Sequence, residues 1–154
     1  MRRPYILFIF LFVAAEIIIS QSCNEADVKS RQGEARSHEF GTNCMSCHQA
    51  NGNGKTAFTI AGSVLDEARA GIQKKCIIQL YTKPKAQGEL VGTFYGDASG
   101  NFYSTEKIDF SAGLYPTLLG TPGVKEDTKH MPTPIFSGAC NSCHGPTTEK
   151  LGID

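Results

Sequence analysis

The chain has 154 residues, and without a leader-like segment of about twenty residues the rest is the size of one ordinary domain. Fifteen basic and fifteen acidic side chains give a formal net charge of zero, which argues against a general nucleic-acid binder or a protein held to membranes by charge. Sixteen glycines and seven prolines, with no tryptophan, favour short strands and turns over long helices.

The first 22 residues predict an export signal. Two arginines precede an apolar run over residues 5–15, which fits a secretory signal and is too short to span a bilayer comfortably. Two cleavage sites are possible for this signal. Small residues at 13–15 suit ordinary cleavage, whereas S-Q-S-C at 20–23 looks like a relaxed lipobox with Cys23 as the lipidated first residue. We expect residues 1–22 to be the signal peptide of a lipoprotein, and residues 23–37 to be a polar linker.

Residues 44–48 read C-M-S-C-H, and residues 140–144 repeat the pattern as C-N-S-C-H. The pattern C-x-x-C-H is the attachment signature of c-type haem, because two thiols on one turn can each bond a porphyrin vinyl group while the following histidine ligates the iron. Two copies use four of the six cysteines and two of the four histidines. The sequence therefore predicts two covalently attached haem c groups, bound through Cys44, Cys47, Cys140 and Cys143, with His48 and His144 as proximal iron ligands.

Two other interpretations of the cysteine pairs stay open. The four thiols could chelate one zinc ion as a split pair of C-x-x-C sites, although the gap between the pairs is unusually long for such a site. They could also form two vicinal redox disulfides, as in thioredoxin-like proteins. Neither interpretation explains why a histidine directly follows each pair.

The two remaining histidines, His38 and His130, supply one candidate for each open iron face. Histidine on both faces suits electron transfer, whereas an open face would suit oxygen or peroxide chemistry. Met131 competes with His130, and a methionine ligand would raise the reduction potential. Neighbouring strand residues point to opposite faces, so only one of the two can easily face a given haem, and we expect it to be His130.

Alternating apolar residues and turn signals between the two motifs predict six short strands, near residues 58–64, 76–81, 90–95, 102–108, 114–119 and 129–136. They predict a mainly β fold, a small antiparallel β-sandwich with its core at about 57–136 inside a domain of residues 38–154. Cys76 is expected to be a buried free thiol, with pairing to Cys23 as the alternative. Six strands would bring both motifs to one end of the sandwich, and a seventh would separate them.

Three stretches carry a resemblance: I-A-G-S-V at 60–64, the hairpin at 92–103 and L-Y-P-T-L at 114–118 look like the carboxypeptidase-regulatory or transthyretin-like sandwich. Flanked by two C-x-x-C-H motifs, residues 38–148 resemble small dihaem c-type cytochromes of that architecture. The resemblance implies haem attachment outside the cytoplasmic membrane, in the periplasm or at the cell surface, which agrees with the export signal.

Together these features predict an exported dihaem cytochrome that passes single electrons between redox protein partners. It would not be an enzyme, would bind no nucleic acid, and would have a membrane tether through lipidated Cys23. The alternative is a β-sandwich binding or sensory module in which haem is structural. A peroxidase-like enzyme is a third possibility, which would require one open iron face.

Overall fold

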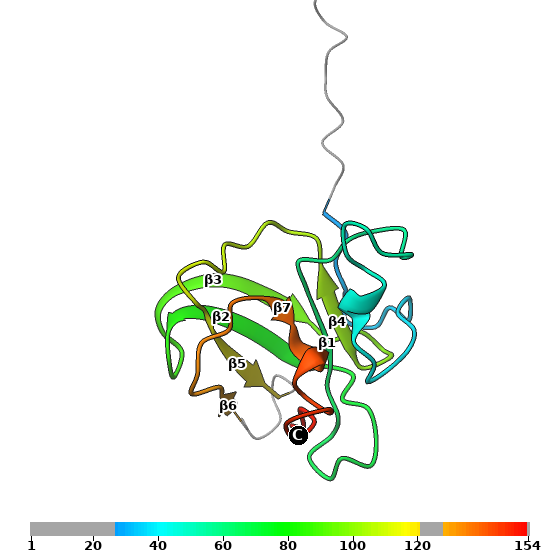
Figure 1. Ribbon diagram of the computed structural model, residues 1–154. Helices are drawn as coiled ribbons and strands as arrows, with labels where there is room; N and C mark the ends of the chain where they lie inside the picture. The colour runs from blue at the N-terminus through cyan, green and yellow to red at the C-terminus, as the bar shows by residue number, and fades with distance from the viewer. Residues whose placement is uncertain (1–26, 121–127, 154) are drawn as a thin grey trace, which may run out of the picture.

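The computed structural model describes residues 27–120 and 128–153, which form two β-sheets (Figure 1). The three-stranded sheet has the order β4-β1-β7, with bounds Asn101–Ser104, Ile60–Ser63 and Gly138–Ala139. The four-stranded sheet has the order β3-β2-β5-β6, with bounds Gln87–Tyr95, Ile77–Lys83, Tyr115–Leu119 and Thr128–His130. Two short 3₁₀ helices, η1 (Cys44–Ser46) and η2 (Cys140–Ser142), contain the cysteine motifs. The predicted mainly β sandwich is confirmed.

Apolar side chains from both sheets form the core. The three-stranded sheet contributes Ile60 and Phe102, and the four-stranded sheet contributes residues such as Leu80. Cys76 is 0 % exposed and is a free thiol, as predicted, and burial raises its pKa to about 12. Ile153 is also fully buried, so the core extends beyond the expected limit at residue 136 to the end of the chain.

Two strands end well before their predicted ends, and one strand was not predicted. β4 ends at Ser104 instead of near residue 108, and β6 ends at His130 shortly before Pro132, which has no N–H to donate to a ladder. β7 has only two residues, Gly138 and Ala139, and pairs in parallel with β1. A strand of two residues produces no alternation, so sequence patterning could not reveal it.

Part of the expected linker belongs to the folded domain. The Ser30 N–H donates to the Tyr103 carbonyl at 2.9 Å, the Thr105 N–H donates to the Val28 carbonyl at 2.9 Å, and Ser30 is buried. These residues therefore cover the free edge of β4, where unpaired backbone groups need partners. Residues 1–26, including the predicted signal peptide and Cys23, lie outside the described residues.

Strand β1 lies between the two cysteine motifs. Its register with β4 pairs Gly62 with Phe102 and Ser63 with Asn101, so alternation places these two pairs on opposite faces of the sheet. η2 follows directly from β7, beside β1 (Figure 1), and η1 also contacts β1. The seventh strand does not separate the motifs, because β7 has only two residues and pairs with Ile60 and Ala61, which leaves η2 alongside the rest of β1.

In the part of the chain that the structure describes, no helix has the length and apolar character needed to cross a bilayer.

Candidate functional site

Both C-x-x-C-H motifs fold into the same local structure. In each, three residues form a 3₁₀ turn, and the second cysteine follows with nearly the same backbone angles: φ −107° and ψ −39° at Cys47, φ −109° and ψ −49° at Cys143. In both motifs the histidine N–H donates to the carbonyl of the first cysteine, at 2.9 Å for His48 and 3.1 Å for His144. Residues three apart eclipse each other in a 3₁₀ turn, so each pair of thiols lies on one side. The sequence repeat is thus a structural repeat.

Both motif histidines present the same ring nitrogen for ligation. The Nδ1 atom of His48 lies 2.8 Å from the Thr56 carbonyl oxygen, and that of His144 lies 2.8 Å from the Glu149 carbonyl oxygen. A carbonyl only accepts hydrogen bonds, so Nδ1 carries the proton and Nε2 keeps its lone pair. This backbone hydrogen bond is the usual support of a metal-ligating histidine.

The first motif lines a cavity of about 220 Å³ beside the three-stranded sheet, together with His38. The His38 and His48 ring centroids are 5.8 Å apart, with the ring planes tilted by 43°. Two imidazoles that ligate one metal ion at about 2 Å have centroids roughly 6 Å apart, so the pair fits shared ligation. The cavity is smaller than the roughly 300–1,000 Å³ of most cofactor sites, and His38 stands on its exposed rim.

Two aromatic rings form a stack with the His48 ring. Phe58 stacks on His48 with centroids 4.2 Å apart and planes 12° apart, and Tyr103 of β4 stacks on Phe58 at 4.9 Å. Gly54 gives the ring room: a Cβ there would lie 2.7 Å from His48 Nδ1 and 2.9 Å from the Cys47 carbonyl oxygen. His48 is therefore held by the sheet behind it and by a loop that requires glycine.

The second motif lines a larger cavity of about 630 Å³, within the usual range for cofactor sites. Its walls include Cys140, Cys143 and His144, and apolar side chains from both sheets, among them Ile78 and Phe102. Phe102 also lines the first cavity, so the two cavities share one buried ring. Burial, with smaller contributions from the nearby Cys44 and Cys143 thiols, raises the pKa of the Cys140 thiol to about 12.

The register of β6 bears on the choice between His130 and Met131. Both residues line the second cavity, but His130 pairs with Thr117, and its Nδ1 lies 3.0 Å from the Thr117 hydroxyl. Met131 continues the ladder through a hydrogen bond from its N–H to the Pro116 carbonyl at 3.0 Å. Alternation then puts Met131 on the face that carries Leu118 and Ile78, and His130 on the opposite face. The register thus puts Met131 on the apolar face, while both residues line the cavity and His130 stays a prediction.

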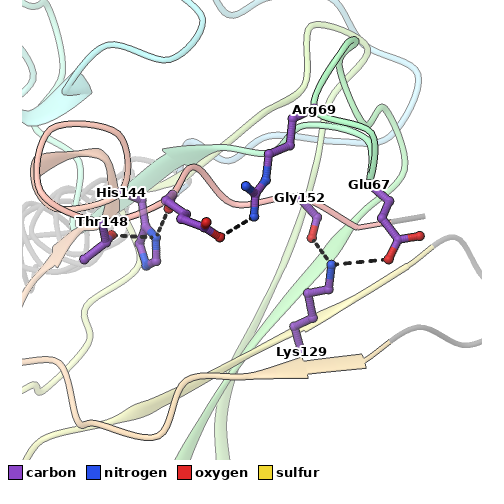
Figure 2. Close-up of polar contacts among 7 residues, drawn as sticks. Glu67, Arg69, Lys129, His144, Thr148 and Gly152 are labelled. Carbon is purple, nitrogen blue, oxygen red and sulfur yellow. Dashed lines mark hydrogen bonds and ion pairs between the residues drawn. The ribbon is translucent and has the colours of Figure 1, made fainter.

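Charged residues that include Arg69, Lys129 and Glu149 line the second cavity. Their contacts join the C-terminal segment to the connection at 65–75 (Figure 2). Arg69 pairs with the Glu149 carboxylate and holds its pKa below the usual value, while the Glu149 carbonyl accepts the His144 hydrogen bond. Lys129 Nζ donates to the Gly152 carbonyl at 2.8 Å and lies 3.8 Å from Glu67. These contacts fix the segment that orients His144.

Three buried polar residues connect the two motifs, and sequence analysis singled out none of them. Asn141, inside the second motif, hydrogen-bonds to Ser63 at the end of β1 and to the Thr42 carbonyl just before the first motif. Ser63 in turn donates to Asn101 at 2.6 Å. We call Ser63, Asn101 and Asn141 the polar cluster. They lie far apart in the sequence, so no local signal could have indicated that they meet.

Within residues 27–120 and 128–153, no three His, Cys, Asp or Glu side chains gather as a metal-binding group. All five described cysteines are free thiols.

No protein-family model matches the chain, and neither a curated protein nor a solved structure matches it.

Gly54→Ala is expected to disturb the first motif. The added methyl group would overlap the edge of the His48 ring, and overpacking of this kind costs about 1–3 kcal/mol in unfolding free energy. Chemical denaturation should show that loss, and amide hydrogen exchange should quicken over residues 54–58, where the Phe58 N–H bonds to the His48 carbonyl. Asn53→Ala, at an exposed position in the same loop, is the control. Unchanged exchange in Gly54→Ala would show that the loop adapts without moving His48.

Proposed function

We propose that the protein is an exported dihaem c-type cytochrome that passes single electrons between redox protein partners. The observation that carries this proposal is the structural repeat: two C-x-x-C-H turns with matching backbone angles, each with a histidine whose Nε2 lone pair is left available. A non-haem role for these residues leaves both the repeat and the two matching histidine hydrogen bonds without a cause.

The chain's own residues suit two haem groups. Cys44 and Cys47 would hold one group through thioethers, and Cys140 and Cys143 the other, with His48 and His144 as proximal ligands. Each group would supply an iron that gains and loses one electron without bond rearrangement. The residues around it would orient the ligands and exclude water: Phe58 stacks on His48, and the Glu149 carbonyl orients His144.

Basic side chains line both cavities and would offset the two propionates that haem carries. Arg36 and Lys55 line the first cavity, and Arg69, Lys129 and Lys150 line the second. Opposite charges a few ångströms apart attract appreciably near a protein surface, so these residues would orient the propionates toward the rim of each cavity.

For the distal ligands, we propose His38 at the first iron and Met131 at the second. Support for His38 is that it lines the first cavity together with His48, with ring centroids 5.8 Å apart. At the second site the β6 register favours Met131, and His130 is the alternative. Imidazole on both faces keeps a reduction potential low, whereas methionine raises it. The two sites would then differ in potential, which gives electron flow a preferred direction.

The first prediction from this proposal is that the purified mature protein carries two covalent haems. Intact mass measured after denaturation should exceed the polypeptide mass by two haem groups, because thioether bonds survive unfolding. Cys143→Ser should weaken attachment at the second site alone, and Cys76→Ser serves as the control because Cys76 lies outside both motifs. A zinc-containing protein without haem mass would contradict the proposal.

The second prediction concerns the distal ligands. Both irons should be low-spin and six-coordinate, so the reduced wild-type protein should bind carbon monoxide only slowly. Met131→Ala should open the second iron to carbon monoxide and abolish a sulfur–iron charge-transfer band in the near-infrared spectrum of the oxidised protein, while His130→Ala should change neither. The reverse result for this pair would assign the site to His130. Rapid carbon monoxide binding by the wild type would favour a sensor or an enzyme.

The third prediction concerns the membrane tether, which we propose is a lipid on Cys23. The mature protein should partition into the detergent phase, and Cys23→Ala should move it to the aqueous phase because acyl chains supply the membrane affinity. Recovery of the wild type wholly in the aqueous phase, with an N-terminus near Glu16, would refute the tether and support ordinary cleavage.

A further inference from the structure

We propose that Asn141, a residue of the second motif, positions the segment at 37–43 that brings His38 to the first site. The inference rests on the proposed function only for the role of His38 as an iron ligand. The two motifs are joined by a direct contact. The Asn141 side chain of the second motif donates to the carbonyl of Thr42, just before the first motif.

The Asn141 side chain uses every hydrogen-bonding group it has. Its Nδ2 donates to the Thr42 carbonyl at 2.8 Å and to the Ser63 hydroxyl at 2.9 Å, and its Oδ1 accepts from the Ser63 N–H at 3.1 Å. The residue is only 4 % exposed. A buried amide with all its partners is costly to remove, because each of those partners then lies buried without one.

Ser63 and Asn101 extend the connection toward His38. The Ser63 hydroxyl accepts from the Gly41 N–H at 2.9 Å and donates to the Asn101 Oδ1. Asn101 Nδ2 donates to the Ser37 hydroxyl at 2.9 Å and to the His38 carbonyl at 3.2 Å. The polar cluster therefore hydrogen-bonds to the segment at residues 37, 38, 41 and 42.

Outside the polar cluster, the contacts of the segment include a hydrogen bond from the Ser37 N–H to the Asp97 carboxylate at 3.3 Å, and its own residues pack weakly. Residues 38–42 are exposed, and the largest apolar side chain among them, Phe40, is 37 % exposed. The segment also contains a positive φ angle of 51° at Glu39, an uncommon conformation for a residue with a Cβ, which the chain would relax if released. Hydrogen bonds to the polar cluster are thus the main constraint on where His38 lies.

Loss of the two Asn141 donors should therefore free the segment and remove His38 from the first site. The second site should keep its ligands, because Cys140, Cys143 and His144 are held by their own turn and by Glu149. A merely structural residue in the second motif would instead disturb its own site first.

Asn141→Asp tests this, because it keeps the shape of the side chain and an oxygen acceptor for the Ser63 N–H but removes both donors. Ser142→Ala is the matched control, since the Ser142 hydroxyl donates to Ala139 within its own turn. In the complete mature protein, hydrogen exchange at the Gly41 amide should rise roughly tenfold or more in Asn141→Asp and stay unchanged in Ser142→Ala. Unchanged exchange at Gly41 in Asn141→Asp would overturn the proposal.

Carbon monoxide binding then identifies the site. The reduced Asn141→Asp and His38→Ala proteins should each bind one equivalent rapidly, and the double variant should also bind one, because both changes open the same iron. Two equivalents in the double variant would mean that Asn141 acts on its own site, and would overturn the inference. If Asn141→Asp does not fold, Ser63→Ala replaces it and should open the same iron, since it removes the acceptor of the Gly41 N–H. A protein without haem would refute the proposed function, while exchange at Gly41 would still decide whether Asn141 holds the segment.

Discussion

The arrangement of both candidate sites depends on one set of hydrogen bonds, those of the polar cluster at the end of β1. Ser63, Asn101 and Asn141 are all buried, and their side chains hydrogen-bond to one another and to backbone groups of two segments, β1 and residues 37–43. Buried amides and hydroxyls are tolerated only when their partners are in place, so the cluster stabilises one relative placement of the two motifs. Any change that breaks hydrogen bonds of the cluster also removes a constraint on the segment that precedes Cys44.

Strand β1 and its pairing with β4 position the polar cluster. One face of the strand meets the core through Ile60, and the other carries Ser63 toward the segment that precedes the first motif. Gly62 allows Phe102 and Cys140 to approach, since a Cβ there would lie 2.6 Å from the Phe102 ring and 3.0 Å from the Cys140 Cβ. Strand β1 therefore brings the two motif turns, which are distant in sequence, close together. Phe102, its neighbour on β4, lines both cavities.

The sequence predicted the features that local patterns encode. The spacing of each C-x-x-C-H motif indicated a single turn with both thiols on one side, and alternation around residue 78 indicated the β2 strand and the burial of Cys76. It could not indicate that Asn141 meets Ser63, because that contact joins residues 78 positions apart. The choice between His130 and Met131 involves a similar long-range feature. Alternation says that neighbours face opposite ways, but only the pairing of β6 with β5 says which of the two shares a face with Leu118.

The central claim is that the two motif turns carry covalent haem, and a reduced-minus-oxidised absorption spectrum of the purified mature protein tests it most directly. We expect the sharp visible bands of low-spin c-type haem to appear on reduction, with intensity for two haems per chain and with the pigment retained after extraction by acidified acetone. Identical, featureless visible spectra in the two oxidation states would contradict the account, and the paired cysteines would then need another explanation.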